Sequence, residues 1–359
     1  MFAGGGTGGH LFPALAVAAE LRRRSPGLPI VFIGGQRGIE TRIVPQHGYP
    51  LRTMPLAGLK GASVTGSMRA AVAAAAGVAR AAAWFLRDRP ALVIGVGGYA
   101  SGPSVLAARL LGVPTMILEQ NHFPGATNRW LARWVDAVCV PSEVARRRLG
   151  NRGTITGNPV AAEFAAIGAP PNAEPLSVLV FGGSRGARSI NRAMAAALPA
   201  LARLARPPRI VHQTGADDFE ATQAAYHSSY SGEFEVQAFF DDMPRRLGNA
   251  DLVFCRAGAT TLSELAVAGR PAILIPYPHA ADDHQTRNAQ ALEEAGAAVV
   301  VRDGDFTAER IAALIQEFAS DAPRRHRMAE AARGLARPDA AAQIADVAET
   351  LRKGGRRVS

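Results

Sequence analysis

Short runs of apolar residues alternate along the chain with longer segments that have helical spacing. Continuous apolar strands joined by helices are typical of parallel sheets that are covered on both faces, so the pattern predicts an α/β fold. The helical candidates include Pro13–Arg24 and Ile190–Arg206. The strand candidates are Ile30–Ile33, Ala91–Ile94, Thr115–Leu118, Ala137–Val140, Ser177–Phe181, Arg209–His212, Leu252–Cys255, Ala272–Ile275 and Ala297–Val301.

The alternation is interrupted once, over residues 157–175, where the sequence GNPVAAEFAAIGAPPNAEP is rich in proline and glycine. Such a stretch is the best candidate for a linker, and a second strand, glycine loop and helix begin directly after it. We therefore expect two Rossmann-like domains with parallel sheets facing a central cleft. The expected divisions are residues 1–160, residues 161–336, and a terminal helix with a basic tail at 337–359.

Composition narrows the class of partner. The 359 residues carry a formal charge of +10, almost wholly from arginine, and aromatic residues make up only 6%. Nucleic-acid binding is disfavoured, because a basic surface for that purpose is usually interleaved with aromatic residues. An anionic membrane surface, a phosphorylated substrate and a simple compositional bias all stay open. With no leader segment before the first glycine loop, we expect a cytoplasmic protein.

Three glycine loops adjoin the predicted strands and helices, at Gly4–Pro13, Gly95–Pro103 and Gly182–Ala187. Glycine lets backbone N–H groups approach phosphate oxygens, and the helix that follows adds its partial positive charge. The first loop matches GxGxxG, but a dinucleotide enzyme also needs an acidic residue at the end of the second strand. That strand is followed by Gln36, and the next carboxylate is Glu40. A dehydrogenase is therefore disfavoured.

A fourth loop, Cys255–Pro271, combines charged groups with a helix start. Arg256 could pair with a diphosphate, and Glu264 could accept hydrogen bonds from ribose hydroxyls or could merely favour the helix dipole. His10, in the first turn of the first helix, is disfavoured as an imidazolium and so suits a general base, or it simply caps or packs. Asp303-Gly304-Asp305 has the spacing of a metal-binding DxD motif, but we interpret it as a turn.

These loops, taken together, resemble the MurG family of glycosyltransferases. The shared runs are GGGTGGHLFPALAVA, GVGGYASGP, LEQNHFPGATNRWLAR, GNPV, FGGSRGARSIN, FDDM, CRAGATTLSELAVAGRPAILIPYP and DHQTRNA. The resemblance implies a GT-B fold with the donor in the C-terminal domain and the acceptor in the N-terminal domain.

The reaction it implies is inverting transfer of GlcNAc from UDP-GlcNAc to the C4 hydroxyl of MurNAc in undecaprenyl-pyrophosphoryl-MurNAc-pentapeptide (lipid I). The products would be lipid II, with a β-1,4 linkage, and UDP, with no cofactor and no catalytic metal. The resemblance also implies a peripheral enzyme at the cytoplasmic face of the plasma membrane, in contact with an anionic membrane surface.

The resemblance also assigns roles to individual residues. His10 is the favoured base, with Glu119 as the alternative. The first two glycine loops would face the acceptor diphosphate, the second through Gly97, Gly98, Tyr99 and Ser101. The remaining positions would bind the donor: Thr7, Gly8, Gly9, Asn121, Ser184, Phe240 (by its backbone), Arg256, Ala259, Thr260, Thr261, Leu262, Ser263, Glu264, His284 and Gln285.

Three positions depart from the family pattern. Only Met1-Phe2-Ala3 precede the first loop, so we expect a shortened first strand. Ala161 stands after GNPV where the family often has arginine, which removes one donor contact. His284 stands where some members have glutamine, which weakens the sugar contact expected there.

The segment Met68–Phe85 could rest on a membrane, with Trp84 and Phe85 as the inserted side chains, or could be a helix that covers the sheet. Three rival functions are less favoured by the motif series. They are a glycosyltransferase acting on a different lipid acceptor such as diacylglycerol, a sugar-nucleotide epimerase of the same architecture, and a basic nucleotide- or RNA-binding module.

Overall fold

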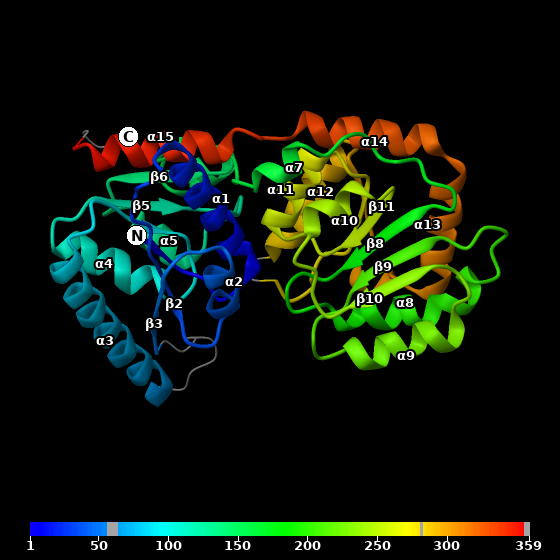
Figure 1. The fold of residues 1–359 in the computed structure, drawn as a ribbon, viewed down its shortest axis with the longest axis horizontal. Helices are drawn as coiled ribbons and strands as arrows, with labels where there is room; N and C mark the ends of the chain where they lie inside the picture. The colour runs from blue at the N-terminus through cyan, green and yellow to red at the C-terminus, as the bar shows by residue number, and fades with distance from the viewer. Residues whose placement is uncertain (56–63, 281–282, 355–359) are drawn as a thin grey trace. The chain divides into compact units, whose positions relative to one another are not determined.

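The computed structural model describes residues 1–55, 64–280 and 283–354, without the side chains of residues 64–71. The chain divides into two compact units (Figure 1). The first comprises Met1–Ala161 together with Arg337–Ser359, and the second comprises Ala162–Ala336. The terminal segment thus returns to the first unit, and the basic tail at 355–359 lies outside the described residues.

The first unit is built on a parallel sheet with strand order β3-β2-β1-β4-β5-β6-β7. β1 is only two residues long, as expected, yet it pairs with both β2 and β4 and so lies inside the sheet. The strands are β1 (Phe2–Ala3), β2 (Phe32–Gly35), β3 (Leu51–Met54), β4 (Val93–Gly95), β5 (Thr115–Leu118), β6 (Ala137–Val140) and β7 (Thr154–Ile155).

The helices of the first unit include one from the far end of the chain. They are α1 (Gly8–Arg24), α2 (Glu40–Gln46), α3 (Val64–Asp88), α4 (Ser101–Leu110), α5 (Ala126–Leu131), α6 (Glu143–Arg148) and α15 (Ala340–Arg352). α15 packs on α1, where Arg24 donates to a carboxylate oxygen of Asp346 at 2.5 Å and to the carbonyl of Ala342 at 3.0 Å.

The second unit repeats the same plan with the strand order β10-β9-β8-β11-β12-β13, all parallel. Its strands are β8 (Ser177–Phe181), β9 (Arg209–Gln213), β10 (Phe234–Gln237), β11 (Leu252–Cys255), β12 (Ala272–Leu274) and β13 (Ala298–Val300). In both units the order runs outward from the first strand in two directions, which is the doubly wound Rossmann arrangement.

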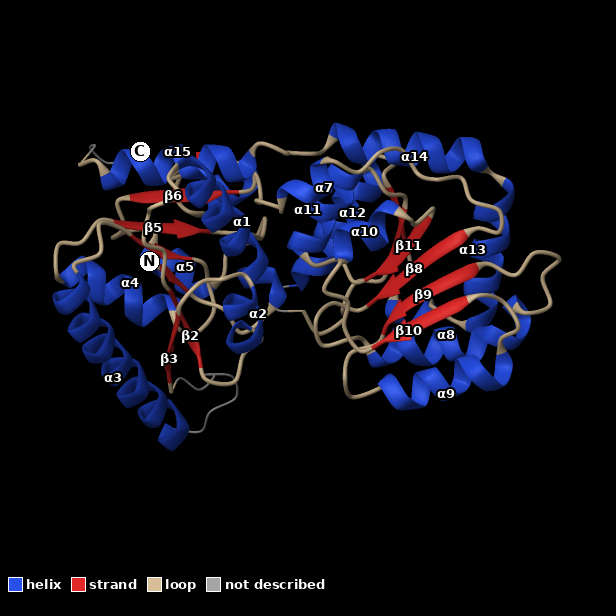
Figure 2. Ribbon diagram, viewed as in Figure 1, coloured by secondary structure: helices blue, strands red, loops and turns tan. Residues whose placement is uncertain are grey.

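Helices cover both faces of this second sheet (Figure 2). They are α7 (Ala162–Ala165), α8 (Arg188–Leu201), α9 (Phe219–Ser229), α10 (Met243–Gly248), α11 (Ala259–Ala268), α12 (His284–Glu294), α13 (Ala308–Ser320) and α14 (Ala322–Gly334), with a short 3₁₀ turn η2 (Asp303–Asp305).

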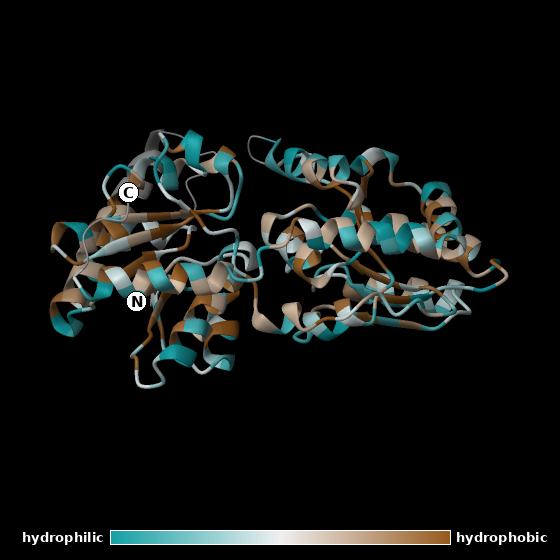
Figure 3. Cartoon of the chain, turned by 90° about the horizontal axis from the view of Figure 1, so that it is seen from above, coloured by the Kyte–Doolittle hydropathy of each residue, from teal (hydrophilic) through white to brown (hydrophobic). Residues whose placement is uncertain are grey.

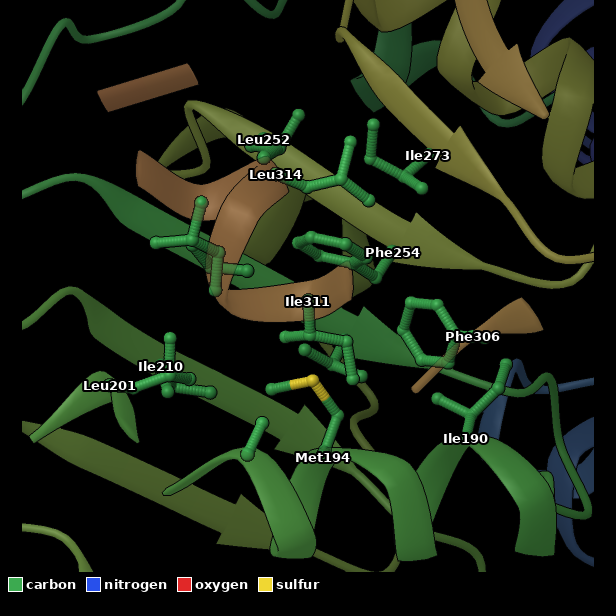
Figure 4. Packing of buried hydrophobic residues seen from close by; sticks show 14 of the residues in the cluster. Ile190, Met194, Leu201, Ile210, Leu252, Phe254, Ile273, Phe306, Ile311 and Leu314 are labelled. Carbon is green, nitrogen blue, oxygen red and sulfur yellow. The ribbon is translucent and has the colours of Figure 1, made fainter. Parts of the chain in front are cut away.

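The main core of the second unit lies between the sheet and helices α8 and α13 (Figure 4). Ile190 and Met194 of α8 and Ile311 of α13 meet Ile210 and Phe254 of the sheet there, all fully buried. The strands are mostly apolar, and hydrophilic residues lie mainly on the helices and loops (Figure 3). A parallel sheet buried on both faces needs continuous apolar strands, which explains the sequence pattern.

The expectation that Phe85 could enter a membrane is wrong. Phe85 is only 2% exposed and packs with Ala81 in the core of the first unit, while Trp84 is half-buried against the same core. The side chain of Phe85 is therefore a core residue rather than one free to enter a membrane. No helix within the described ranges is both long enough and apolar enough to cross a bilayer.

Candidate active site

The first glycine loop presents His10 at the start of α1. The backbone at Gly4, Gly5 and Gly6 has positive φ, and α1 begins two residues later. The Nδ1 atom of His10 lies 3.3 Å from the hydroxyl of Thr7. Burial lowers the pKa of His10, so its imidazole is neutral at pH 7, as a general base requires. The cause is desolvation rather than the helix dipole expected from the sequence.

The second glycine loop packs against the first, backbone to backbone. The N–H of Gly5 donates to the carbonyl of Gly97 at 3.3 Å, and a Cβ on Gly98 would lie 2.3 Å from the carbonyl oxygen of Gly5. Tyr99 is exposed, whereas the side chain of Ser101 is buried. A ligand at this loop can therefore meet the Tyr99 side chain, whereas Ser101, expected at the acceptor, is fully buried and lies out of its reach.

A buried carboxylate that the sequence analysis left without a role lies beneath the first loop. Glu40 accepts hydrogen bonds from the backbone N–H of Gly6 and from that of Gly35, each at 2.8 Å. Its side chain is so closely surrounded that a Cβ on Gly38 would overlap its carboxylate. In a dehydrogenase the acidic residue in this part of the chain binds ribose, whereas here its oxygens hold the loop itself.

Glu119, the alternative base, is also committed to holding a loop. It follows β5, is 4% exposed, and accepts hydrogen bonds from the backbone N–H of Asn121 at 2.9 Å and from the Asn128 side chain at 2.8 Å. Burial raises its pKa, and these hydrogen bonds oppose that change. The Asn121 side chain also donates to Glu119, at 3.2 Å, so the carboxylate orients Asn121.

In the second unit, Gln213 joins two of the expected donor loops. Its side chain donates to the carbonyl of Gly183 at 3.0 Å and accepts the backbone N–H of Phe240 at 2.8 Å. Ser184 is half-buried in the same glycine loop, ahead of α8. Because the backbone N–H of Phe240 already donates to Gln213, only the backbone carbonyl of Phe240 remains to bind the uracil of a nucleotide. The sequence held no signal for Gln213, which is a polar residue at the end of a buried strand.

Helix α11 carries the run Ala259–Glu264 at its start. Thr260 and Leu262 are buried, whereas Thr261, Ser263 and Glu264 are half-buried. Burial raises the pKa of Glu264 to about 8, so the carboxyl is largely protonated at pH 7. Vicinal ribose hydroxyls that donate to its two oxygens would favour the ionised form when a nucleotide binds.

Arg256, which directly follows β11, is held by groups from other loops. Its guanidinium donates to a carboxylate oxygen of Asp303 at 2.5 Å and to the hydroxyl of Ser189 at 2.7 Å. Asp303-Gly304-Asp305 does form a turn, the 3₁₀ turn η2, but Asp303 has this additional partner. Among the described residues, no three acidic, histidine or cysteine side chains are grouped as a metal site would need.

Gln285 and His284 begin α12. The side-chain oxygen of Gln285 accepts the backbone N–H of Tyr277 at 2.9 Å, which orients its NH₂ group away from that contact. The loops after β8, β9, β11 and β12 thus lie at the carboxyl edge of one sheet, where open α/β sheets bind ligands. The structure brings most of the expected donor residues to that edge, and His10, Gly97, Gly98 and Glu119 to the corresponding edge of the first sheet.

The comparisons with known proteins agree with this architecture. Residues 1–140 match the glycosyltransferase family 28 N-terminal domain, and residues 177–348 match the glycosyltransferase family 28 C-terminal domain. A Myxococcus xanthus protein named UDP-N-acetylglucosamine--N-acetylmuramyl-(pentapeptide) pyrophosphoryl-undecaprenol N-acetylglucosamine transferase is 44% identical over 354 residues, covering 98% of this chain and 92% of the relative.

Two solved structures extend the comparison. The crystal structure of Acinetobacter baumannii MurG has a TM-score of 0.74 at 32% identity, with 98% of each chain covered. A putative UDP-N-acetylglucosamine 2-epimerase from Listeria monocytogenes has a TM-score of 0.69 at 14% identity, covering 99% of this chain and 96% of that one, which shows the shared fold alone. The expected α/β fold of GT-B type, with two Rossmann-like units, is confirmed, and the chain belongs to glycosyltransferase family 28 and, within it, to the MurG family.

Proposed function

We propose that this enzyme transfers N-acetylglucosamine from UDP-GlcNAc to the C4 hydroxyl of MurNAc in undecaprenyl-pyrophosphoryl-MurNAc-pentapeptide, giving lipid II and UDP. The Myxococcus xanthus relative is named as the enzyme that transfers N-acetylglucosamine to N-acetylmuramyl-(pentapeptide) pyrophosphoryl-undecaprenol. The observation in this chain that supports it best is the start of α11, where Arg256 and Glu264 lie within nine residues of each other. This pairing suits a nucleoside diphosphate, because an arginine can bind phosphate and a carboxyl can bind ribose hydroxyls.

In this proposal the second unit binds the donor and the first unit binds the acceptor. Departure of UDP leaves growing negative charge on the diphosphate, which Arg256 and the amino termini of α8 and α11 stabilise. Inversion at the anomeric carbon requires a deprotonated acceptor hydroxyl on the opposite side of the sugar from the departing UDP.

His10 is the general base of this proposal. Its lowered pKa keeps the imidazole neutral, and it lies beside the two interlocked glycine loops. Glu119 is buried with its oxygens occupied by Asn121 and Asn128, so we assign it to positioning Asn121 instead. Replacing His10 with alanine should lower kcat about 10²- to 10⁴-fold; near-normal turnover would remove His10 from this role.

Transfer of labelled GlcNAc to a short-chain lipid I analogue tests the function. We expect labelled product with UDP-GlcNAc and none with UDP-galactose. Conversion of UDP-GlcNAc without any acceptor would instead favour an epimerase, and product formed on diacylglycerol would favour a different lipid glycosyltransferase.

We further propose that the first unit rests on an anionic membrane through a surface at the ends of α4 and α5. Leu110, Trp130 and Trp134 are 71%, 48% and 55% exposed there. Beside them lies a hollow of about 480 Å³, lined by Trp130 and the four arginines Arg129, Arg133, Arg148 and Arg152, with no acidic residue in its lining. Exposed tryptophan with clustered arginine suits the interface of an anionic bilayer.

Vesicle binding tests this surface. The double substitution Trp130→Ser and Trp134→Ser should weaken binding to vesicles that contain anionic lipid, while Tyr277→Ser, an exposed aromatic residue of the second unit, serves as the control. Equal binding of the double variant and the control would exclude the surface. Phe85→Ser should instead destabilise the fold, because Phe85 is a core residue.

A further inference from the structure

Arg256, at the end of β11, belongs to a closed network of hydrogen-bonded side chains. Its Nη1 atom donates to Asp303 at 2.5 Å and to the carbonyls of Ile275 and Pro276 at 3.1 and 3.2 Å. Its Nη2 atom donates to the hydroxyl of Ser189 at 2.7 Å. The hydroxyl of Ser189 in turn donates to the same Asp303 oxygen at 2.7 Å. Three side chains thus close a ring.

The members of this ring come from three separate loops of the second unit. Ser189 lies in the first turn of α8, directly after the third glycine loop, and Arg256 lies two residues before the N-cap of α11. Asp303 lies in η2, after β13. The ring therefore fixes the guanidinium between two helix amino termini, where the peptide dipoles favour an anion.

A purely structural arginine in the same unit looks different. Arg270 is 1% exposed and donates to carbonyls of Leu247, Ala268 and Gly269, among others, and no carboxylate in the described part of the chain accepts from it. Arg256 instead has a carboxylate partner that is itself 22% exposed, and its Nη2 atom, which carries two N–H groups, gives only one of them to the ring. A compensated cation that keeps N–H groups outside the ring is arranged to receive a further anion.

We propose that Asp303, together with Ser189, is a positioning residue for the donor site. Asp303 holds Arg256 in one rotamer and balances its charge until the diphosphate binds. This inference rests on the proposed function, in which the second unit binds UDP-GlcNAc. A guanidinium fixed in advance needs no reorganisation when negative charge grows on the departing UDP.

Two variants of Asp303 separate the effect of its negative charge from its effect on the position of Arg256. Asp303→Ala removes both, so Arg256 loses its fixed rotamer, and the affinity for UDP should fall about tenfold, the factor of ~1.4 kcal/mol. Asp303→Asn keeps an oxygen that can accept from Arg256 and Ser189 but removes the counter-charge, so UDP should bind at least as tightly as to the wild type. The affinity for uridine, which has no phosphate, should be the same for both variants and the wild type.

Isothermal titration with UDP and with uridine is the measurement, and Asp305→Asn in the same turn is the matched control, because Asp305 is exposed and is expected to leave UDP binding unchanged. Steady-state transfer should show kcat falling for Asp303→Ala and largely kept for Asp303→Asn.

A UDP affinity of Asp303→Ala equal to that of Asp305→Asn would overturn the inference, and so would an equal loss for uridine and UDP. If Asp303→Ala does not fold, Asp303→Asn decides alone: a loss of UDP affinity of tenfold or more contradicts the account. Wild-type protein that fails to bind UDP would contradict the proposed function instead.

Discussion

At the scale of single residues, the chain uses buried charge in two different ways. Arg270 caps helix ends and joins the segment around Gly168 to α10 and α11, and burial lowers its pKa to about 10. Glu264 has its pKa raised to about 8 at the start of α11. The first group stabilises the fold, whereas the second is left where a ligand can reach it, which is typical of functional sites.

Replacing Glu264 with glutamine should change stability and binding in opposite directions. The folded-state pKa of Glu264 is raised from 4.5 to about 8, so its contribution to stability is present below pH 4.5 and is lost as the pH rises through 8. Glutamine carries no such penalty, so Glu264→Gln should be more stable than the wild type at pH 9. Because the side chain keeps part of its contact with solvent, we expect a gain of about 1 kcal/mol rather than the full shift.

The same substitution should weaken UDP binding about tenfold, because the amide has one acceptor oxygen, whereas the carboxylate that the ribose hydroxyls favour has two. Denaturation at pH 5 and pH 9, with titration of UDP, gives both quantities. Equal stability of the two proteins at pH 9 would contradict the burial argument, and unchanged UDP affinity would contradict the role on ribose.

At the scale of elements, the apolar pattern predicted the inner strands well. β5, β6, β8 and β11 have the expected bounds, and the helical candidates overlap α1 and α8. The missed strands β3, β7 and β10 lie at the edges of the two sheets, where one side is open and the sequence need not be continuously apolar. β1 was expected only as a short strand, and its central position comes from pairing, which the sequence does not display.

The candidate site was predictable only in part, for a similar reason. Glycine loops and the α11 start are local motifs, so His10, Arg256 and Glu264 could be found from spacing. The groups that hold them come from distant segments: Asp303 lies 47 residues from Arg256, and Glu40 lies 34 residues from Gly6. Such partners depend on the packing of separate loops rather than on any local pattern.

Glu40 provides a test of the first glycine loop as an element. Its two oxygens accept the N–H groups of Gly6 and Gly35, so Glu40→Ala leaves two partly buried donors without their partner. We expect a loss of about 2–4 kcal/mol in unfolding free energy and at least a tenfold fall in kcat/KM as the loop moves. The unfolding free energy and kcat/KM of Glu40→Gln should lie between those of the wild type and Glu40→Ala, because one side-chain oxygen is kept. Full activity of Glu40→Ala would show that the loop keeps its conformation unaided.

At the scale of the whole molecule, the chain crosses from the first unit to the second and then returns. α15 places Ile344, Val347 and Leu351 in buried positions and packs on α1, whose first turn carries His10. The last helix of the sequence therefore supports the unit that contains the first glycine loop.

Weakening the packing of α15 should destabilise the first unit. Ile344→Ala removes a large buried side chain and should lower the unfolding free energy of the first unit by about 2–4 kcal/mol. Amide exchange along α1 should then be faster, while exchange in β8 and β11 stays unchanged. Thr350→Ala, at an exposed position of the same helix, is the control and should stay within about 0.5 kcal/mol of the wild type. Faster exchange in β8 instead of α1 would contradict the assignment of α15 to the first unit.

In the proposed reaction the enzyme joins GlcNAc to the C4 hydroxyl of a lipid-linked MurNAc with inversion. NMR of the product made from UDP-GlcNAc and a soluble lipid I analogue tests it most directly. We predict a β-configured anomeric proton on the new GlcNAc, correlated with C4 of MurNAc. An α-configured product, a linkage to any other hydroxyl, or GlcNAc found only as free sugar or as an altered sugar nucleotide would contradict it.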